Sequence, residues 1–161
     1  MINRAVVLDT NIIISAGIQL AGPSHKIVEL VLDGELLMFA CPTVLEEYFE
    51  VLARPRFKKH LFPPVWLPSL LECGTLRPED PVPWPHPGPD ADDLVFLALA
   101  RQEGAVLVTG NVADYPEAIR DGVIVRTPRQ FLDLWIEETQ RLGPTGPASL
   151  AGPPPGGPPG R

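Results

Sequence analysis

The stretch AVVLDTNIIISAG, residues 5–17, contains the pattern that decides the fold. Its first part, AVVLD (5–9), is a short, β-branched apolar run that ends at an acid, as expected for a buried strand of a parallel sheet. Its second part, TNIIISAG (10–17), indicates the start of a helix, which we expect Gly17 to break. A strand that leads into a helix is the repeating unit of an α/β domain.

The same alternation continues along the chain. Further strands are expected at LLMFA (36–40), AVLVTG (105–110) and VIVRT (123–127). Helices are expected from Ser24 to Asp33, at TVLEEYFEVLAR (43–54), over the apolar run 94–100 and at PRQFLDLWIEE (128–138). Because parallel neighbours require a crossover connection, this order predicts an α/β domain with a parallel sheet.

Composition limits how the chain is organised. Its 161 residues, 45% of them hydrophobic, suffice for one domain with a sizeable core, which we expect to span residues 1–142. Six of the twelve residues from 78 to 89 are proline, which predicts an extended surface loop. Thirteen of the nineteen residues from 143 to 161 are Gly or Pro, which predicts a disordered tail.

The composition also argues against several classes of protein. No apolar run approaches the ~20 residues of a membrane span, and the start of the chain lacks a signal-peptide pattern, so we expect a cytoplasmic protein with no membrane partner. The two cysteines and three histidines lack the spacing of a disulfide framework or a zinc site. A net charge of −7 argues against sequence-blind adhesion to nucleic acid, although it leaves room for a local basic patch.

Acidic side chains gather where the predicted strands end. Asp9 ends the first strand, Glu46 follows the second, and the three aspartates of PDADD (89–93) precede the apolar run 94–100. Each has an ordinary structural explanation as a helix cap, including a T-x-x-E capping box from Thr43 to Glu46. At one sheet edge, however, each close pair would repel by ~1–4 kcal/mol. A hard divalent cation such as Mg²⁺ or Mn²⁺ would offset that repulsion.

These stretches resemble the motifs of the PIN domain nucleases, and in particular of the bacterial PIN-domain toxins of toxin–antitoxin pairs. VVLDTN (6–11) is similar to the opening motif, TVLEE (43–47) to the second, DDLVFLALA (92–100) to the Asp-headed helix and VLVTGN (106–111) to the T-G-N motif. The resemblance covers roughly residues 6–135. It implies a three-layer α/β/α sandwich with a central parallel sheet, and divalent-metal-dependent endoribonuclease activity.

Carried over residue by residue, the resemblance makes Asp9, Glu46 and Asp93 the catalytic acids and the ligands of Mg²⁺ or Mn²⁺. Glu47 competes with Glu46, because both flank the apolar face of the predicted helix; the T-x-x-E spacing favours Glu46. Asp92 is a further candidate ligand, which could bind through water. The number of bound metal ions stays open.

Four further residues would support the site by the same resemblance. Asn11 would hold Asp9 and the start of the following helix in place, and Thr109 belongs to the T-G-N motif. Asn111 stands where many relatives carry a fourth acid, so this position keeps an oxygen but loses the charge. Asp114 is near in sequence and could replace that acid.

The substrate and partners also follow from the resemblance. The metal would activate water for phosphodiester hydrolysis, which would leave 5′-phosphate and 3′-hydroxyl ends on the RNA. The stretch RPRFKKH (54–60) combines cations with an aromatic residue, which suits single-stranded RNA, although a solvated helix end explains the cations equally well. The candidate RNA-binding residues are Arg54, Arg56, Lys58 and Lys59. A small antitoxin protein and a homo-oligomer are the expected protein partners.

Two other interpretations are open to test. Haloacid-dehalogenase-type phosphatases also begin with an apolar strand and an aspartate, but they require a second Asp where this chain has Asn11. A catalytically inactive PIN-like module for RNA binding or protein interaction would keep the acids only as caps. We favour the nuclease, because the first three acids of the motifs are present.

Deleting residues 143–161 should leave the melting temperature and the response to metal unchanged, because a Gly/Pro-rich segment without apolar bulk contributes little to a core. Thermal melting of the full-length and truncated chains, with and without Mn²⁺, checks this. A marked loss of stability on truncation would show that the tail packs against the domain.

Overall fold

A computed structural model describes residues 3–58 and 62–143. In this part of the chain, five strands form one sheet in the order β3-β2-β1-β4-β5, and every pairing is parallel. The strands are β1 (Ala5–Leu8), β2 (Leu37–Ala40), β3 (Thr75–Leu76), β4 (Val106–Val108) and β5 (Val125–Arg126). Strands β2 and β3 are added on one side of β1, and the chain then returns to add β4 and β5 on the other side. The topological switch point therefore lies between β1 and β4.

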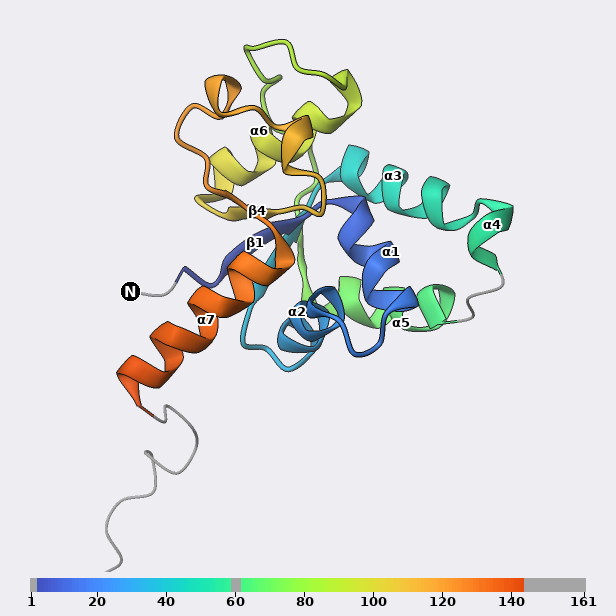
Figure 1. Ribbon diagram of the computed structural model, residues 1–161. Helices are drawn as coiled ribbons and strands as arrows, with labels where there is room; N and C mark the ends of the chain where they lie inside the picture. The colour runs from blue at the N-terminus through green and yellow to red at the C-terminus, as the bar shows by residue number, and fades with distance from the viewer. Residues whose placement is uncertain (1–2, 59–61, 144–161) are drawn as a thin grey trace, which may run out of the picture.

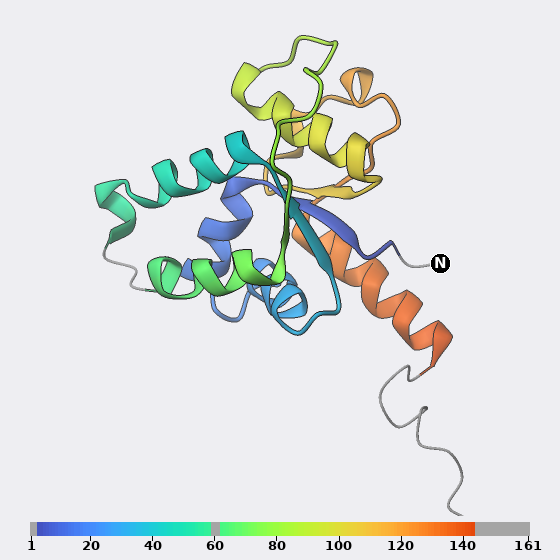
Figure 2. The ribbon, with the colours of Figure 1, turned by 180° about the vertical axis from the view of Figure 1, so that it is seen from behind.

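Helices cover both faces of the sheet. They are α1 (Thr10–Ile18), α2 (Pro23–Leu32), α3 (Pro42–Leu52), α4 (Pro55–Lys58), α5 (Phe62–Cys73), α6 (Leu94–Glu103) and α7 (Pro128–Leu142). Helix α6 lies on one side of the strands, and α2 and α7 lie on the other (Figures 1 and 2). The predicted three-layer α/β/α sandwich with a parallel sheet is therefore confirmed.

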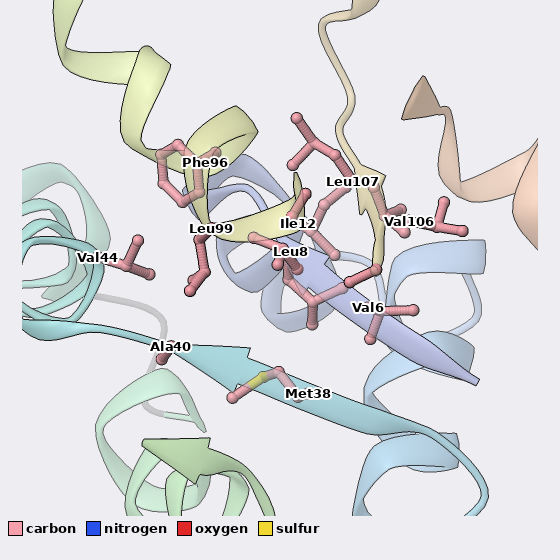
Figure 3. Packing of buried hydrophobic residues seen from close by; sticks show 14 of the residues in the cluster. Val6, Leu8, Ile12, Met38, Ala40, Val44, Phe96, Leu99, Val106 and Leu107 are labelled. Atoms are coloured by element: carbon pink, nitrogen blue, oxygen red, sulfur yellow. The ribbon is translucent and has the colours of Figure 1, made fainter. Parts of the chain in front are cut away.

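The core forms where the central strands meet these helices. Val6, Val7 and Leu8 of β1 are fully buried, as a strand covered on both faces requires. Phe96 and Leu99 of α6 are also fully buried, and Figure 3 shows them beside the strands. A strand held in this way has a fixed carboxyl end, so the residue that follows it, Asp9, has a fixed position.

The strands and helices near both ends of the chain match the sequence-based expectations, with differences at their boundaries. Gly17 does not break α1, which continues to Ile18, since glycine is tolerated inside a helix at a cost of about 1 kcal/mol. Helix α3 ends at Leu52, and Pro55 begins the short α4. Pro128 occupies the first turn of α7, where its missing N–H is no loss.

Besides the short α4, helix α5 and strand β3 were not expected from the sequence. Helix α5 contains Pro68 and has Pro63 and Pro64 directly after its first residue, so its composition favours a loop. Strand β3 has only two residues, both exposed, which is too short for an alternating pattern. Both lie at one edge of the sheet, where β3 pairs with β2 through Phe39 and Thr75.

The proline-rich loop (78–89) has no regular structure, as predicted, but it is anchored to the domain. Asp80 accepts hydrogen bonds from the backbone N–H and the hydroxyl of Thr43, near the start of α3. Trp84 is buried, and its indole Nε1 donates to the carbonyl oxygen of Ile119 at 2.8 Å. The loop therefore reaches Asp90 along a fixed path.

The predicted tail and one candidate RNA-binding residue cannot be compared with the structure. All of the tail except Gly143 lies outside the described residues, and Lys59 lies outside them too. Among the helices that the structure describes, none is both long and apolar enough to cross a membrane.

Replacing Trp84 by alanine should lower the free energy of unfolding by about 3–5 kcal/mol, because the indole is buried and the carbonyl of Ile119 loses its donor. Replacing the partly exposed His86, which pairs with Asp121, by alanine should cost less than about 1 kcal/mol. Chemical denaturation of both variants measures the difference. Equal losses would show that Trp84 is not part of the core.

Candidate metal centre

The parallel register brings the ends of β1 and β4 together. Val6 and Leu8 pair with Val106 and Val108, and the backbone N–H of Asp9 donates to the carbonyl oxygen of Val108 at 2.9 Å. Thr109 follows Val108 directly, so it lies next to Asp9 at the switch point of the sheet. This is the position at which open α/β sheets bind their ligands.

Asp9 occupies the N-cap position of α1, yet its side chain does not cap the helix. The carboxylate oxygen Oδ2 instead accepts hydrogen bonds from the Thr109 hydroxyl at 2.8 Å and the Tyr115 hydroxyl at 2.9 Å. The residue is only 4% exposed. A buried carboxylate held by two hydroxyl groups is not explained by helix capping.

Two more acids approach Asp9 from other elements. Glu47 lies in the middle of α3, and Asp93 stands at the N-cap of α6. Asp9, Glu47 and Asp93 each offer a carboxylate oxygen, and these three oxygens lie within 4.8 Å of one another. The Thr10 hydroxyl donates to Glu47 Oε1 at 3.0 Å, which ties α3 to the start of α1. Residues far apart in the sequence thus converge on one point.

The geometry favours Glu47, the alternative to Glu46. Glu46 is exposed, and it does not belong to the acidic cluster that the described residues form. Helix α3 begins at Pro42 with Cys41 as its N-cap, so Thr43 does not cap this helix and pairs with Asp80 instead. The capping box that would have explained Glu46 structurally is therefore absent, and it is the position of Glu47 within the acidic cluster that favours Glu47 as the ligand.

Burial acts on all three clustered acids, and the negative charge of Asp9 acts on the other two. Burial raises the pKa of Asp9, although the hydrogen bonds from Thr109 and Tyr115 oppose this change. Burial, followed by the negative charges of Asp9 and its neighbours, raises the pKa of Asp93 to about 7. Burial also raises the pKa of Glu47, with a smaller contribution from the charge of Asp9. The cluster therefore holds negative charge at a cost in stability.

These three residues fit a divalent cation. Among the side chains that the structure describes, no lysine, arginine or histidine forms an ion pair with Asp9, Glu47 or Asp93. Carboxylate oxygens are the ligands that Mg²⁺ and Mn²⁺ prefer, and a cation would reverse the effect of burial on each carboxyl pKa. Asp9, Glu47 and Asp93 are thus the residues that would hold such an ion.

The supporting residues form a network around Asp9. Asn11 Oδ1 accepts from the backbone N–H of Gly110 at 2.8 Å, and Asn11 Nδ2 donates to Thr109 Oγ1 at 3.4 Å. Asn11 therefore ties α1 to the end of β4. Asn111 Nδ2 donates to Asp114 Oδ2 at 2.7 Å, and the charge of Asp114 contributes to the raised pKa of Asp9 and Asp93.

A groove of about 530 Å³ adjoins the cluster between α3 and the turn before α6. Glu47 and Asp93 line it, so two of the three clustered acids are accessible from the groove. Asp92 also lines the groove but does not join the cluster. Its backbone N–H donates to Asp90 Oδ1, which shows that Asp90 caps the short 3₁₀ turn Ala91–Asp93.

The structure describes three of the four candidate RNA-binding residues. Arg54 lines the groove and lies 4.0 Å from Glu50. Arg56 is exposed, and its guanidinium lies over the ring of Phe57 at 4.7 Å from the centroid. Lys58 ends α4, and Lys59 lies outside the described residues.

Tyr115 is the residue of this site that the sequence did not reveal. Its hydroxyl reaches Asp9 across 106 positions of the chain, and the side chain is fully buried. It follows the 3₁₀ turn Val112–Asp114, in a stretch that the sequence marks only as an irregular turn. The sequence offers little to indicate that Tyr115 belongs to the site, beyond its place directly after Asp114.

Replacing Asp93 by asparagine should stabilise the metal-free protein at high pH. The pKa of Asp93 is about 7 in the folded protein against an ordinary value of 3.8, so its favourable contribution is complete below about pH 4 and is lost as the pH rises through 7. Asparagine has no proton to lose, so the variant should melt about 2–8 °C above the parent protein at about pH 8.

Calorimetric melting in the presence of a chelator, at about pH 4 and about pH 8, measures this effect. At about pH 4 the variant should show no advantage over the parent protein. A difference in melting temperature that does not change with pH would mean that Asp93 carries no raised pKa.

Comparison with known proteins identifies the family. The sequence profile described as the PIN domain matches residues 5–113, more than half of the chain. The fold is similar to a chain in the crystal structure of VapBC2 from Rickettsia felis bound to a DNA fragment from their promoter, with a TM-score of 0.53, 18% sequence identity and coverage of 76% of this chain and 98% of that chain. No curated protein matches the sequence. The matched profile and the shared fold show that this protein belongs to the PIN domain family.

Proposed function

We propose that this protein is a divalent-metal-dependent endoribonuclease and the toxin of a toxin–antitoxin pair. The observation that carries the nuclease proposal is the convergence of Asp9, Glu47 and Asp93, whose carboxylate oxygens lie within 4.8 Å of one another. Membership of the PIN domain family supports it. The toxin proposal rests on the motif resemblance and on the structural similarity to VapBC2.

The chain's own residues would prepare the site for this reaction. Thr109 and Tyr115 hold the Asp9 carboxylate, and Thr10 holds Glu47. A bound Mg²⁺ or Mn²⁺ would supply activated water and stabilise charge on the phosphodiester. In the overall reaction one water is consumed, the bond from phosphorus to the 3′ oxygen breaks, and 5′-phosphate and 3′-hydroxyl ends result.

The substrate must reach a site with acidic walls. Because the groove beside the cluster is lined mainly by acids, RNA binding would depend on cations at its border. Arg54 lines the groove and Arg56 carries a stacked aromatic neighbour, so these two residues are the described candidates for holding a single-stranded backbone. Lys58 and Lys59 are further candidates for RNA binding, proposed from the sequence alone. An antitoxin partner, assembly into a homo-oligomer and a cytoplasmic location are likewise proposed from the sequence.

Removing one acid of the cluster should abolish metal-dependent cleavage, while removing its exposed neighbour should not. We expect Asp9→Asn, Asp93→Asn and Glu47→Gln each to lower the Mn²⁺-dependent cleavage rate of single-stranded RNA by about 100-fold or more, because several kcal/mol of charge stabilisation depend on the metal. Glu46→Gln should retain activity within about threefold, since Glu46 is exposed outside the cluster.

Each variant is purified in the same way and its folding is checked by melting, so that a contaminating ribonuclease would appear equally in all samples. Activity in folded Asp9→Asn equal to that of the parent protein would contradict the proposed nuclease. Loss of activity in Glu46→Gln but not in Glu47→Gln would restore Glu46 as the ligand. If the parent protein neither cleaves RNA nor gains stability with Mn²⁺, the chain is the inactive PIN-like module instead.

A further inference from the structure

Tyr115 makes a contact that ordinary core packing does not require. Its ring is fully buried, and its hydroxyl donates to Asp9 Oδ2 at 2.9 Å. Buried tyrosine hydroxyls usually find a partner, and a backbone carbonyl is sufficient, as Tyr48 shows by donating to the carbonyl oxygen of Leu8. The hydroxyl of Tyr115 is instead directed at an acid of the metal-binding cluster.

Both side-chain hydroxyl groups that reach Asp9 end on the same oxygen. Thr109 donates to Oδ2 at 2.8 Å, so Oδ2 accepts two hydrogen bonds from two different segments of the chain. Neither hydroxyl group engages Oδ1. Two donors on one oxygen fix the rotation of a carboxylate about its Cβ–Cγ bond, because any rotation breaks at least one of them.

The donor from Tyr115 is itself held in place. The backbone N–H of Tyr115 donates to the carbonyl oxygen of Val112 at 3.0 Å, and its carbonyl oxygen accepts from Arg120 Nε at 2.7 Å. Burial raises the pKa of the Tyr115 phenol, so the hydroxyl keeps its proton and remains a donor. A fixed backbone and a buried ring give the hydroxyl one position from which to donate.

We propose that Tyr115 is a positioning residue that, together with Thr109, holds Asp9 by Oδ2 and so leaves Oδ1 as the single oxygen that Asp9 gives to the metal. This inference rests on the proposed metal-dependent function. It assigns to Tyr115 a role in metal affinity that is separate from its contribution to the core. Groups that orient metal ligands in this way commonly change metal affinity by 10–100-fold when they are removed.

Replacing Tyr115 by phenylalanine tests the proposal, with Tyr48→Phe as the matched control. Both variants of the full chain lose one buried hydroxyl group and keep the ring, but only Tyr115 donates to a carboxylate of the cluster. Calorimetric titration with Mn²⁺ should show an affinity about 10-fold weaker in Tyr115→Phe and unchanged within about twofold in Tyr48→Phe. Melting temperatures of the metal-free variants report the structural contribution separately.

A second pair of variants makes the test independent of whether Tyr115→Phe folds. Thr109→Val removes the other hydroxyl group on Oδ2, whereas Thr109→Ser keeps it. The serine variant should bind Mn²⁺ like the parent protein, and the valine variant should bind it about 10-fold more weakly.

The outcomes separate this inference from the proposed function. Equal Mn²⁺ affinities for Tyr115→Phe and Tyr48→Phe, in a protein that binds Mn²⁺, would overturn the role of Tyr115 and leave the metal site standing. If Tyr115→Phe does not fold, equal affinities for Thr109→Val and Thr109→Ser would overturn the holding of Oδ2. A parent protein that binds no Mn²⁺ would contradict the proposed function and this inference together.

Discussion

The burial of one carboxylate, Asp9, at the carboxyl end of the central strand is the constraint on which the site depends. A buried acid needs partners, and Asp9 finds them in Thr109 and Tyr115. The parallel pairing of β1 with β4 delivers Thr109, and the turn after β4 delivers Tyr115. The order of the strands therefore brings Asp9 and its two hydrogen-bond donors to the same place.

The acids that join Asp9 lower the stability of the metal-free protein. Burial raises the carboxyl pKa values of Asp9, Glu47 and Asp93, and the charge of Asp9 adds to this effect on Glu47 and Asp93. No ion pair among the described side chains neutralises any of the three. The surrounding contacts nevertheless hold them in place. Thr10 holds Glu47, and the anchored proline-rich loop leads into the turn that carries Asp93. Acids held together in this way support the proposed cation site, because a divalent cation would offset their repulsion.

The sequence predicts the architecture well, because alternating apolar strands and helices allow few arrangements of a parallel sheet. It also makes Asp9 and Asp93 candidate ligands, because they stand at an abrupt change between apolar and acidic residues, and the structure brings both into the acidic cluster. Its T-x-x-E spacing favours Glu46, whereas the structure brings Glu47 into the acidic cluster, because the rotation of the helix that carries both residues depends on tertiary packing. The sequence gives no indication of the role of Tyr115, because its partner Asp9 is 106 positions away and no sequence motif marks a tyrosine in a turn as part of a site. Helix α5 is not predicted from the sequence because its prolines favour a loop.

The position of a bound metal ion is the sharpest test of the proposed metal centre. Crystals of the full chain grown with Mn²⁺ would give an anomalous difference signal at any manganese site. We predict a peak bound by one oxygen each of Asp9, Glu47 and Asp93, with Asp9 contributing Oδ1 and its Oδ2 still held by Thr109 and Tyr115. A peak on the exposed acids of the groove, with none between these three residues, would contradict this prediction.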